Sequence, residues 1–382
     1  MRRARFALVL VVAALGAACS TLGGAPGQPE GLPHGGTGPF RLLTADEVDV
    51  PPSPTGATLF DRDRGVGSGM VADRHLFYGG APLLPVEEPD GGPADAGLDG
   101  AVDDGGLSDA GIGDAGVGDA GPIDAGPSGP LEIDWSLFEP RRIYRSAPRA
   151  EGIGFDAGEQ VLAASEAWEG GFVHDPWAVV LEDGRTRLYY AAEGGIGVAE
   201  AATIGGAFTR LGSRPILAGD VRRPSVIDAR GTESEHAFLM YFERDGGIAV
   251  AGSSDGIEFT ELGAIALTAL AARDERDSVE VSVGGPGALA ARTEAGRSIV
   301  RLYYESRRES GQILIAMAGS FDGVEFEEHP IPVVDDDALR WPAPRQLDPR
   351  VTLLYLQAAR GGRPPERGTL VVGIAPGGVI LP

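Results

Sequence analysis

Short apolar strands with an aromatic centre recur along the chain and alternate with polar, glycine-rich turns. They read LYY, MYF, LYY, LYL and LFY, at 188–190, 240–242, 302–304, 354–356 and 76–78. After each one, a turn leads into a second apolar strand rich in small residues, as at 248–259 and 313–326. Before four of them lies a third element that carries a proline, at 174–180, 222–228, 284–290 and 343–347. The pattern predicts one antiparallel unit repeated five times.

The spacing of the aromatic strands fits a β-propeller. Successive intervals of 52, 62 and 52 residues separate the tyrosines Tyr189, Tyr241, Tyr303 and Tyr355. A four-stranded propeller blade takes roughly 40–50 residues, and closing such units into a ring leaves only short sheet edges exposed. We therefore expect an all-β fold, a five-bladed β-propeller over residues 39–382, with these tyrosines on one face of their strands and packed between blades.

The proline-containing elements are the expected source of a site. The first strand of each propeller blade lines the central channel, so the residues just before the prolines should face its mouth: Asp175, Arg223, Gly285 and Ala343. The sequence has no glycine-rich phosphate loop, no Cys/His metal spacing and no nucleophile elbow. We therefore expect neither a cofactor nor a metal.

Three segments carry a resemblance to a known group of enzymes. HDPWAVV at 174–180, RLYYA at 187–191 and IGVA at 196–199 resemble the five-bladed propellers of the arabinanase, β-xylosidase, levansucrase and invertase glycosidases. The resemblance implies three channel carboxylates from different blades, two of which flank the glycosidic bond. Asp175 matches the Asp-Pro position of that pattern, whereas arginine, glycine and alanine occupy the later positions. The catalytic set is incomplete, so we expect glycan binding rather than hydrolysis.

Further side chains are candidates for the same site. The carboxylates that could complete a hydrolase with Asp175 follow the aromatic strands or flank the proline elements: Glu243, Glu305, Glu280 and Asp348. Aromatic faces stack on sugar rings, and guanidinium groups donate hydrogen bonds in a planar fork. The candidates for binding a sugar are therefore His174, Trp177, Arg222, Arg223 and Trp341. Two alternatives stay open. One is an active glycoside hydrolase that uses Asp175, and the other is an envelope propeller that binds a protein.

The first 19 residues resemble a bacterial lipoprotein signal. Arginines precede an apolar run at 6–15 that is too short to span a bilayer, and small residues then lead to Cys19, the only cysteine. The resemblance implies a lipid on Cys19, with residues 20–38 as a flexible tether; an ordinary secretory signal is the alternative. The residue directly after Cys19 is Ser20 and not aspartate, which favours the outer membrane. We expect a monomer that contacts the membrane only through its lipid.

An acidic low-complexity segment spans residues 87–130. It contains 11 acidic and no basic residues and repeats Asp-Ala-Gly. Because it has few large apolar groups to bury, we expect a disordered insert in the first blade. Its acids lack the close alternation of a calcium-binding loop. The net charge of −24 argues against nucleic acid and anionic membrane surfaces as partners.

Overall fold

The computed structural model describes residues 40–42, 52–53, 56–57, 60–63, 66–80, 142–148, 155, 158–267, 280–293, 296–308, 311–329, 332–334, 339–349, 351–358 and 367–376. They all belong to one compact unit, made of 1–82 and 129–382. The expected signal with Cys19, the tether at 20–38 and the acidic insert at 87–130 lie outside the described residues. Within them, no helix has the length and apolarity needed to cross a membrane.

Four antiparallel sheets are each built from strands that follow one another in the chain. The first sheet contains β5 (Val66–Ala72), β6 (His75–Gly80), β7 (Arg142–Ser146) and β8 (Glu159–Ala163). The second contains β9 (His174–Val180), β10 (Thr186–Ala192), β11 (Gly195–Ala201), β12 (Thr209–Arg210) and β13 (Leu217–Ala218). The third contains β14 (Arg222–Asp228), β15 (Phe238–Arg244), β16 (Gly247–Ser253) and β17 (Thr260–Ala264). The fourth contains β18 (Glu280–Arg292), β19 (Ser298–Arg308), β20 (Ile313–Ser320) and β21 (Glu327–Glu328).

A composite sheet combines strands from both ends of the chain. It contains β22 (Leu339–Asp348), β23 (Val351–Ala358) and β24 (Arg367–Pro376), and β24 also pairs with β1 (Arg41–Leu42) and β4 (Phe60–Asp63). Two further short strands, β2 (Pro52–Ser53) and β3 (Gly56–Ala57), pair only with each other among the described strands. A 3-10 helix at Ala167–Glu169 precedes β9.

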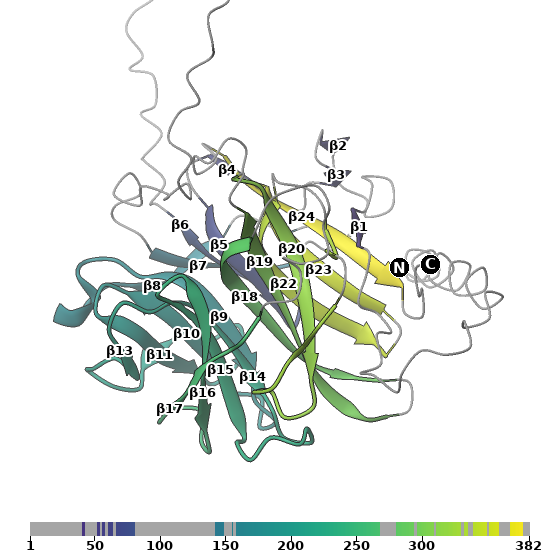
Figure 1. Ribbon diagram of the computed structural model, residues 1–382. Coiled ribbons are helices and arrows are strands. Elements are labelled where there is room, and N and C mark those ends of the chain that lie inside the picture. Colours follow the sequence, from purple (N-terminus) through teal and green to yellow (C-terminus); the bar gives the residue numbers. More distant parts are fainter. Residues whose placement is uncertain are drawn as a thin grey trace, which may run out of the picture. The chain divides into compact units, whose positions relative to one another are not determined.

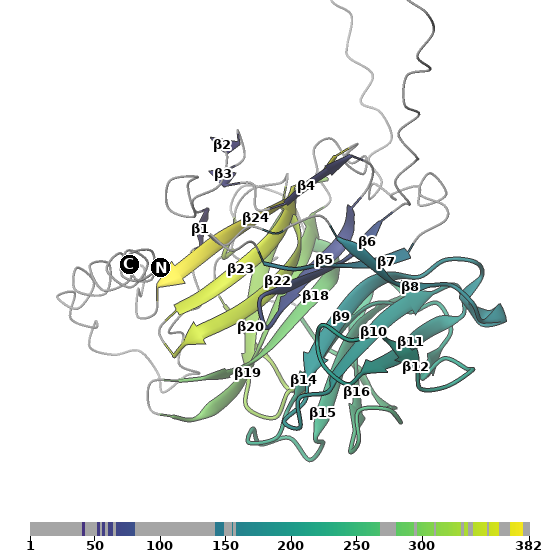
Figure 2. The ribbon, with the colours of Figure 1, turned by 180° about the vertical axis from the view of Figure 1, so that it is seen from behind.

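The sheets follow one another around a common centre (Figures 1 and 2). Each first strand contacts the first strand of the next sheet, in the order β5, β9, β14, β18, β22 and back to β5. The expectation of an all-β propeller is confirmed. Four blades, not the expected five, are made entirely of strands that follow one another in the chain. The remaining sheet contains strands from both ends of the chain.

The elements expected from the sequence are present in the expected order within each sheet. The aromatic segments form the second strands β6, β10, β15, β19 and β23, and the proline elements form β9, β14, β18 and β22. Tyr189, Tyr241, Tyr303 and Tyr355 are at most 3% exposed and occupy equivalent register positions, which confirms that they share one face. Since β6 and β7 are neighbours, residues 81–141 connect two strands of the first sheet.

Tyrosine hydroxyls join successive sheets. Tyr189 donates a hydrogen bond to the Gly256 carbonyl at 2.8 Å, and Tyr241 donates to the Gly323 carbonyl at 2.9 Å. Each acceptor lies in the Asp-Gly turn of the following sheet, where the glycine has a positive φ of 73° or 81°. Each loop joins the third and fourth strands of its sheet. The tyrosines therefore do more than pack, because they fix each sheet to a backbone atom of the next.

Removing either hydroxyl should loosen one junction between sheets. We expect Tyr189→Phe and Tyr241→Phe each to lower the free energy of unfolding by about 1 kcal/mol, the net contribution of one hydrogen bond. Because the two bonds join different pairs of sheets, the losses should add in the double variant. Urea unfolding followed by circular dichroism measures both quantities. Unchanged midpoints in both single variants would contradict this role.

Candidate functional site at the centre of the ring

Each first strand bends at the same register position. On β9, Asp175 and Pro176 together face the single residue Tyr190, since His174 pairs with Ala191 and Trp177 with Tyr189. Equivalent two-residue bulges occur on the other first strands, at Arg223–Pro224, Gly285–Pro286, Trp341–Pro342 and Gly67–Ser68. A bulge of this kind redirects side chains locally, and its fivefold repetition redirects them around one centre.

In all four proline-bearing bulges, the residue before the proline has a positive φ, in the left-handed region. The φ angles are 49° for Asp175, 52° for Arg223, 55° for Gly285 and 52° for Trp341. For a non-glycine residue this region costs roughly 1–2 kcal/mol. Backbone strain of this kind tends to occur at binding and catalytic sites, where the surrounding structure maintains it. Three strained side chains on three different strands therefore mark the centre of the ring as a candidate functional site.

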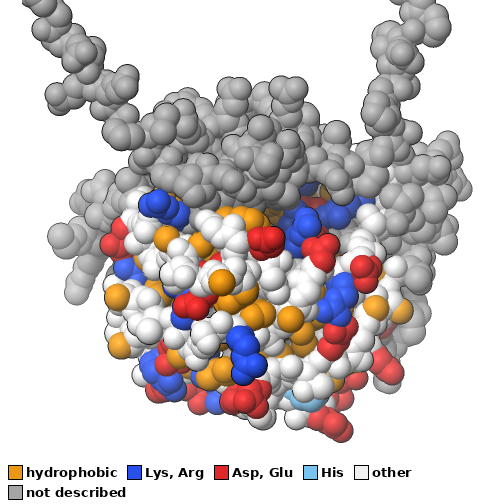
Figure 3. All heavy atoms as spheres, turned by 90° about the vertical axis from the view of Figure 1, so that its left-hand side faces the viewer, with side chains coloured by type: hydrophobic (Ala, Val, Ile, Leu, Met, Phe, Trp, Pro, Cys, Tyr) orange, Lys and Arg blue, Asp and Glu red, His pale blue; other side chains and the backbone are white. Residues whose placement is uncertain are grey.

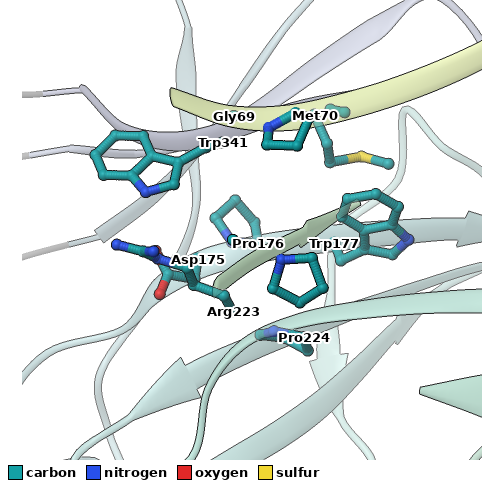
Figure 4. Close-up of a pocket in the computed structure, with 12 residues that line it drawn as sticks. Gly69, Met70, Asp175, Pro176, Trp177, Arg223, Pro224 and Trp341 are labelled. Carbon is teal, nitrogen blue, oxygen red and sulfur yellow. The ribbon is translucent and has the colours of Figure 1, made fainter. Parts of the chain in front are cut away.

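These bulges surround a hollow of about 310 Å³ that is partly open to solvent. Its lining consists of Gly69, Met70, Asp175, Pro176, Trp177, Arg223, Pro224, Gly285, Pro286, Trp341, Pro342 and Ala343. In the view of Figure 4 the indole rings of Trp341 and Trp177 stand at opposite sides of the hollow, and Pro176 and Pro224 lie between them. This volume includes space that is open to solvent.

The structure brings four of the sequence candidates to this hollow: Asp175, Trp177, Arg223 and Trp341. One expected channel position was wrong. On β22 the residue before the proline of the bulge is Trp341, not Ala343, because Pro342 rather than Pro344 occupies the bulge. Ala343 still lines the hollow but pairs in regular register with Tyr355.

Other candidates lie beside or away from the hollow. His174 is buried next to it, with Nδ1 2.9 Å from the Asp175 Oδ2 atom. Arg222 has a side chain that is 51% exposed and pairs with Asp220, away from the lining. Trp177 donates its indole N–H to the Val226 carbonyl at 2.7 Å, so its ring is fixed between the second and third sheets.

Glu243 and Glu305 lie behind the lining and are bound by arginines. Glu243 Oε1 accepts a hydrogen bond from Arg223 Nη1 at 2.8 Å. Glu305 Oε2 lies 3.8 Å from the same Arg223 atom, and its Oε1 accepts the Trp341 backbone N–H at 3.0 Å. The Arg223 guanidinium also lies 5.1 Å from the centre of the Trp341 ring. These side chains connect the third, fourth and composite sheets.

Arg307 completes this cluster and was not a candidate from the sequence. Its Nη2 donates to Glu243 Oε1 at 2.9 Å and to Glu305 Oε2 at 3.0 Å. One sequence signal could have found it, because Glu305 and Arg307 are two residues apart on a predicted strand and therefore share a face. Nothing in the sequence placed Glu243 opposite them, since that contact spans 64 residues.

The arginines keep Glu305 ionised. Burial alone would raise the pKa of the Glu305 carboxyl, but the charges of Arg307, Arg223 and Arg340 and the Trp341 N–H outweigh it, so the pKa is lowered from its ordinary value of 4.5. Burial also acts to lower the pKa of Arg307, and the two glutamates reverse that effect and raise it. Both partners are therefore charged at neutral pH.

Two glycines on β18 lie against this cluster. A Cβ atom on Gly284 would overlap the Glu243 carboxylate and the Arg307 guanidinium, and one on Gly285 would lie 3.0 Å from the Glu305 carboxyl carbon. No larger side chain fits at Gly284 while this cluster is present. Among the described residues, no group of three or more His, Cys, Asp or Glu side chains has metal-binding geometry.

Comparison with known proteins is informative at the level of the fold. No family profile and no curated protein matches the sequence. A fructofuranosidase variant from Schwanniomyces occidentalis, solved with fructosylnystose, is 11% identical over 87% of this chain and 60% of its own, with a TM-score of 0.51. A β-1,2-mannobiose phosphorylase from Listeria innocua is 10% identical over 88% and 94% (TM-score 0.49). An endo-arabinase from Bacteroides thetaiotaomicron is 16% identical over 64% and 87% (TM-score 0.46). The fructofuranosidase likeness shows that the chain has a β-propeller fold.

The strain at Asp175 can be measured. Glycine adopts φ near 49° freely, so we expect Asp175→Gly to be more stable than Asp175→Ala by about 1–2 kcal/mol in urea unfolding. At the exposed strand residue Thr260 the order should reverse, because glycine weakens an ordinary strand. Equal stabilities for the two Asp175 variants would show that the backbone there is unstrained.

The charge of Glu305 predicts a pH-dependent contribution to stability. A lowered folded-state pKa stabilises the protein above the unfolded value of about 4.5, and this stabilisation is lost as the pH falls through the folded-state pKa. We expect Glu305→Gln to be less stable than the wild type at pH 7, with the difference shrinking below about pH 4.5. Thermal unfolding across this range measures it. A difference that stays constant with pH would contradict the assignment.

Proposed function

We propose that the protein binds a neutral oligo- or polysaccharide at the centre of the ring and does not hydrolyse it. One observation carries the proposal. The hollow presents two indoles, Asp175 and Arg223, whereas both nearby glutamates are held by arginines. The site has the contacts that recognise a sugar but not a second available carboxylate among the described residues that surround it.

Hydrolysis of a glycosidic bond requires an acid that protonates the leaving oxygen and a carboxylate that attacks or activates water. Glu305 is unsuited to the first role, because its pKa is lowered and its side chain is only 2% exposed. Glu243 Oε1 already accepts hydrogen bonds from Arg223, Arg307 and the Gly285 N–H. Neither glutamate beside the hollow is therefore placed to act as the acid in a reaction that uses Asp175.

Sugar recognition fits the chemistry of the lining. Indole faces stack on the apolar faces of pyranose and furanose rings, and carboxylate and guanidinium groups bond their hydroxyls. Arg223 is fixed on one side by Glu243 and lies over the Trp341 ring, so its direction is set before a ligand arrives. Such preorganisation reduces the cost of ordering side chains on binding.

The charge balance favours a neutral ligand. Arg223 and Arg307 are matched by Glu243 and Glu305, so these four side chains sum to zero at neutral pH. The chain as a whole carries −24, which opposes the approach of an anionic polymer. Acidic and basic side chains are interspersed on the face seen in Figure 3, without a broad basic area.

We also infer that the ring has five blades, with the composite sheet as the fifth. Its first strand β22 has the same proline bulge as β9, β14 and β18, and it contacts both β18 and β5. Pairing of β1 and β4 with β24 supplies the outer strand that β22–β24 lack. This arrangement would bind the two ends of the domain together.

The proposed location is the bacterial cell envelope. The sequence of the first 19 residues supports a lipid on Cys19, and residues 20–38 would tether the propeller to the outer membrane. Placed there as a monomer, the domain would meet surface or periplasmic polysaccharide. Metabolic labelling with a fatty-acid analogue tests the lipid, which Cys19→Ala should abolish.

Binding of purified propeller to a glycan array tests the proposed function. We expect saturable binding to at least one neutral glycan, with no shortened product after prolonged incubation. Replacing Asp175 by Asn or Arg223 by Gln should weaken it at least tenfold, since each removes a polar contact to the ligand worth about 1.4 kcal/mol or more. The exposed Arg222→Gln is the matched control and should bind as the wild type does.

Each alternative gives a different result in the same experiments. Cleavage products that disappear in Asp175→Asn would establish a glycoside hydrolase. Absence of binding to every glycan, together with specific capture of an envelope protein that Arg223→Gln abolishes, would support a protein-binding propeller. Either result would contradict the proposed function.

A further inference from the structure

Three charged side chains lie behind the hollow without lining it: Glu243, Glu305 and Arg307. They come from β15 and β19, the second strands of adjacent sheets. Glu305 is the most buried, and Arg307 is 21% exposed. Their position suggests that they act on the hollow through the residues that form its wall.

Each glutamate holds the main chain of one left-handed residue. The Gly285 N–H donates to Glu243 Oε1, and the Trp341 N–H donates to Glu305 Oε1 at 3.0 Å. Glu243 also holds the side chain of Arg223. A carboxylate therefore holds a backbone N–H in two of the four proline-bearing bulges, and it holds the Arg223 side chain in a third. Strained backbone persists only where surrounding contacts hold it, and these hydrogen bonds supply such contacts.

Arg307 makes this arrangement electrostatically possible. It donates to both glutamates through Nη2, and its Nε lies 3.3 Å from Glu305 Oε2. Two carboxylates this close would repel each other, and the buried one would favour its protonated form. A protonated glutamate loses acceptor capacity, so the hydrogen bond that it accepts from a backbone N–H becomes weaker.

We infer that Arg307 is a positioning residue for the central site: by bonding both Glu243 and Glu305, it holds Gly285, Trp341 and Arg223 in the geometry that receives the ligand. That the ligand is a glycan rests on the proposed function, whereas the positioning role does not. Among the described residues, the groups that face the two carboxylates come from four different first or second strands. Arg223 comes from β14, Arg307 from β19 and Arg340 from β22, and the N–H groups of Gly285 and Trp341 come from β18 and β22.

The test compares Arg307→Met, which removes the charge, with Arg307→Lys, which retains it. Arg244→Met is the matched control, because the Arg244 side chain is 27% exposed and pairs with a different glutamate, Glu261. Glycan affinity is measured from about pH 8 to about pH 5, a range in which an ionised carboxylate should not titrate. In parallel, isotope-labelled tryptophan allows the Trp341 amide signal to be followed by NMR over the same range.

We expect wild type and Arg244→Met to show flat profiles in both measurements. Arg307→Met should bind roughly tenfold more weakly, on the scale of losing a supporting contact behind a binding site. Its affinity should fall further as the pH decreases, and its Trp341 amide signal should shift with an apparent pKa inside the range. Arg307→Lys should restore most of the affinity and leave a smaller pH response than Arg307→Met, because a lysine reaches the two carboxylates less well than the forked guanidinium.

Flat profiles for Arg307→Met, with wild-type affinity, would overturn the positioning role. If the wild type binds no glycan, the proposed function fails, and the Trp341 amide titration still decides the role of Arg307. If Arg307→Met does not fold, Arg307→Lys decides: a lysine reaches the two carboxylates less well than the forked guanidinium, so a measurable pH response of its Trp341 amide is expected, and none would contradict the inference.

Discussion

The bend before the proline in four of the five first strands is the constraint on which the site depends. It places one residue at φ near 50° on β9, β14, β18 and β22, and thereby turns four backbones toward a shared centre. Proline fixes its own φ and removes a donor, so the ladder is interrupted at the same register each time. A regular strand would alternate its side chains between neighbouring sheets and would leave the hollow without Asp175, Arg223 and Trp341.

The buried cluster behind the bends determines what chemistry the hollow can support. The position before the proline on β18 is glycine, and the volume beside the preceding Gly284 is filled by the Glu243–Arg307 contact. Carboxylates are therefore present near the hollow, but as acceptors for arginines and backbone N–H groups. Catalysis needs carboxyl groups with available protons or lone pairs, whereas Glu243 and Glu305 accept hydrogen bonds from arginines and backbone N–H groups. This contrast is the basis of our proposal that the hollow binds a sugar without cleaving it.

The sequence predicted the repeat, the strand order and most of the lining, because these follow from local patterns. Aromatic strands recur at fixed intervals, and a proline marks each bend, so Asp175 and Arg223 could be located directly. Two neighbouring prolines on β22 made the choice between Trp341 and Ala343 ambiguous, since the register of the bulge depends on the pairing with β23. The spacing from Glu305 could have pointed to Arg307, but its role could not be predicted, because that role arises from the proximity of Glu243, which is 64 residues away in the sequence. The composite sheet was likewise hidden, since it pairs strands from opposite ends of the chain.

A crystal structure of the propeller soaked with a neutral oligosaccharide that it binds would test the central claim most directly. The account predicts an intact sugar between the Trp341 and Trp177 rings, with hydroxyls bonded to Asp175 and Arg223 and with Glu243 and Glu305 still paired to Arg307. A cleaved sugar at this site, a glutamate that has left its arginine to approach the glycosidic oxygen, or a ligand bound only on the outer surface would contradict it.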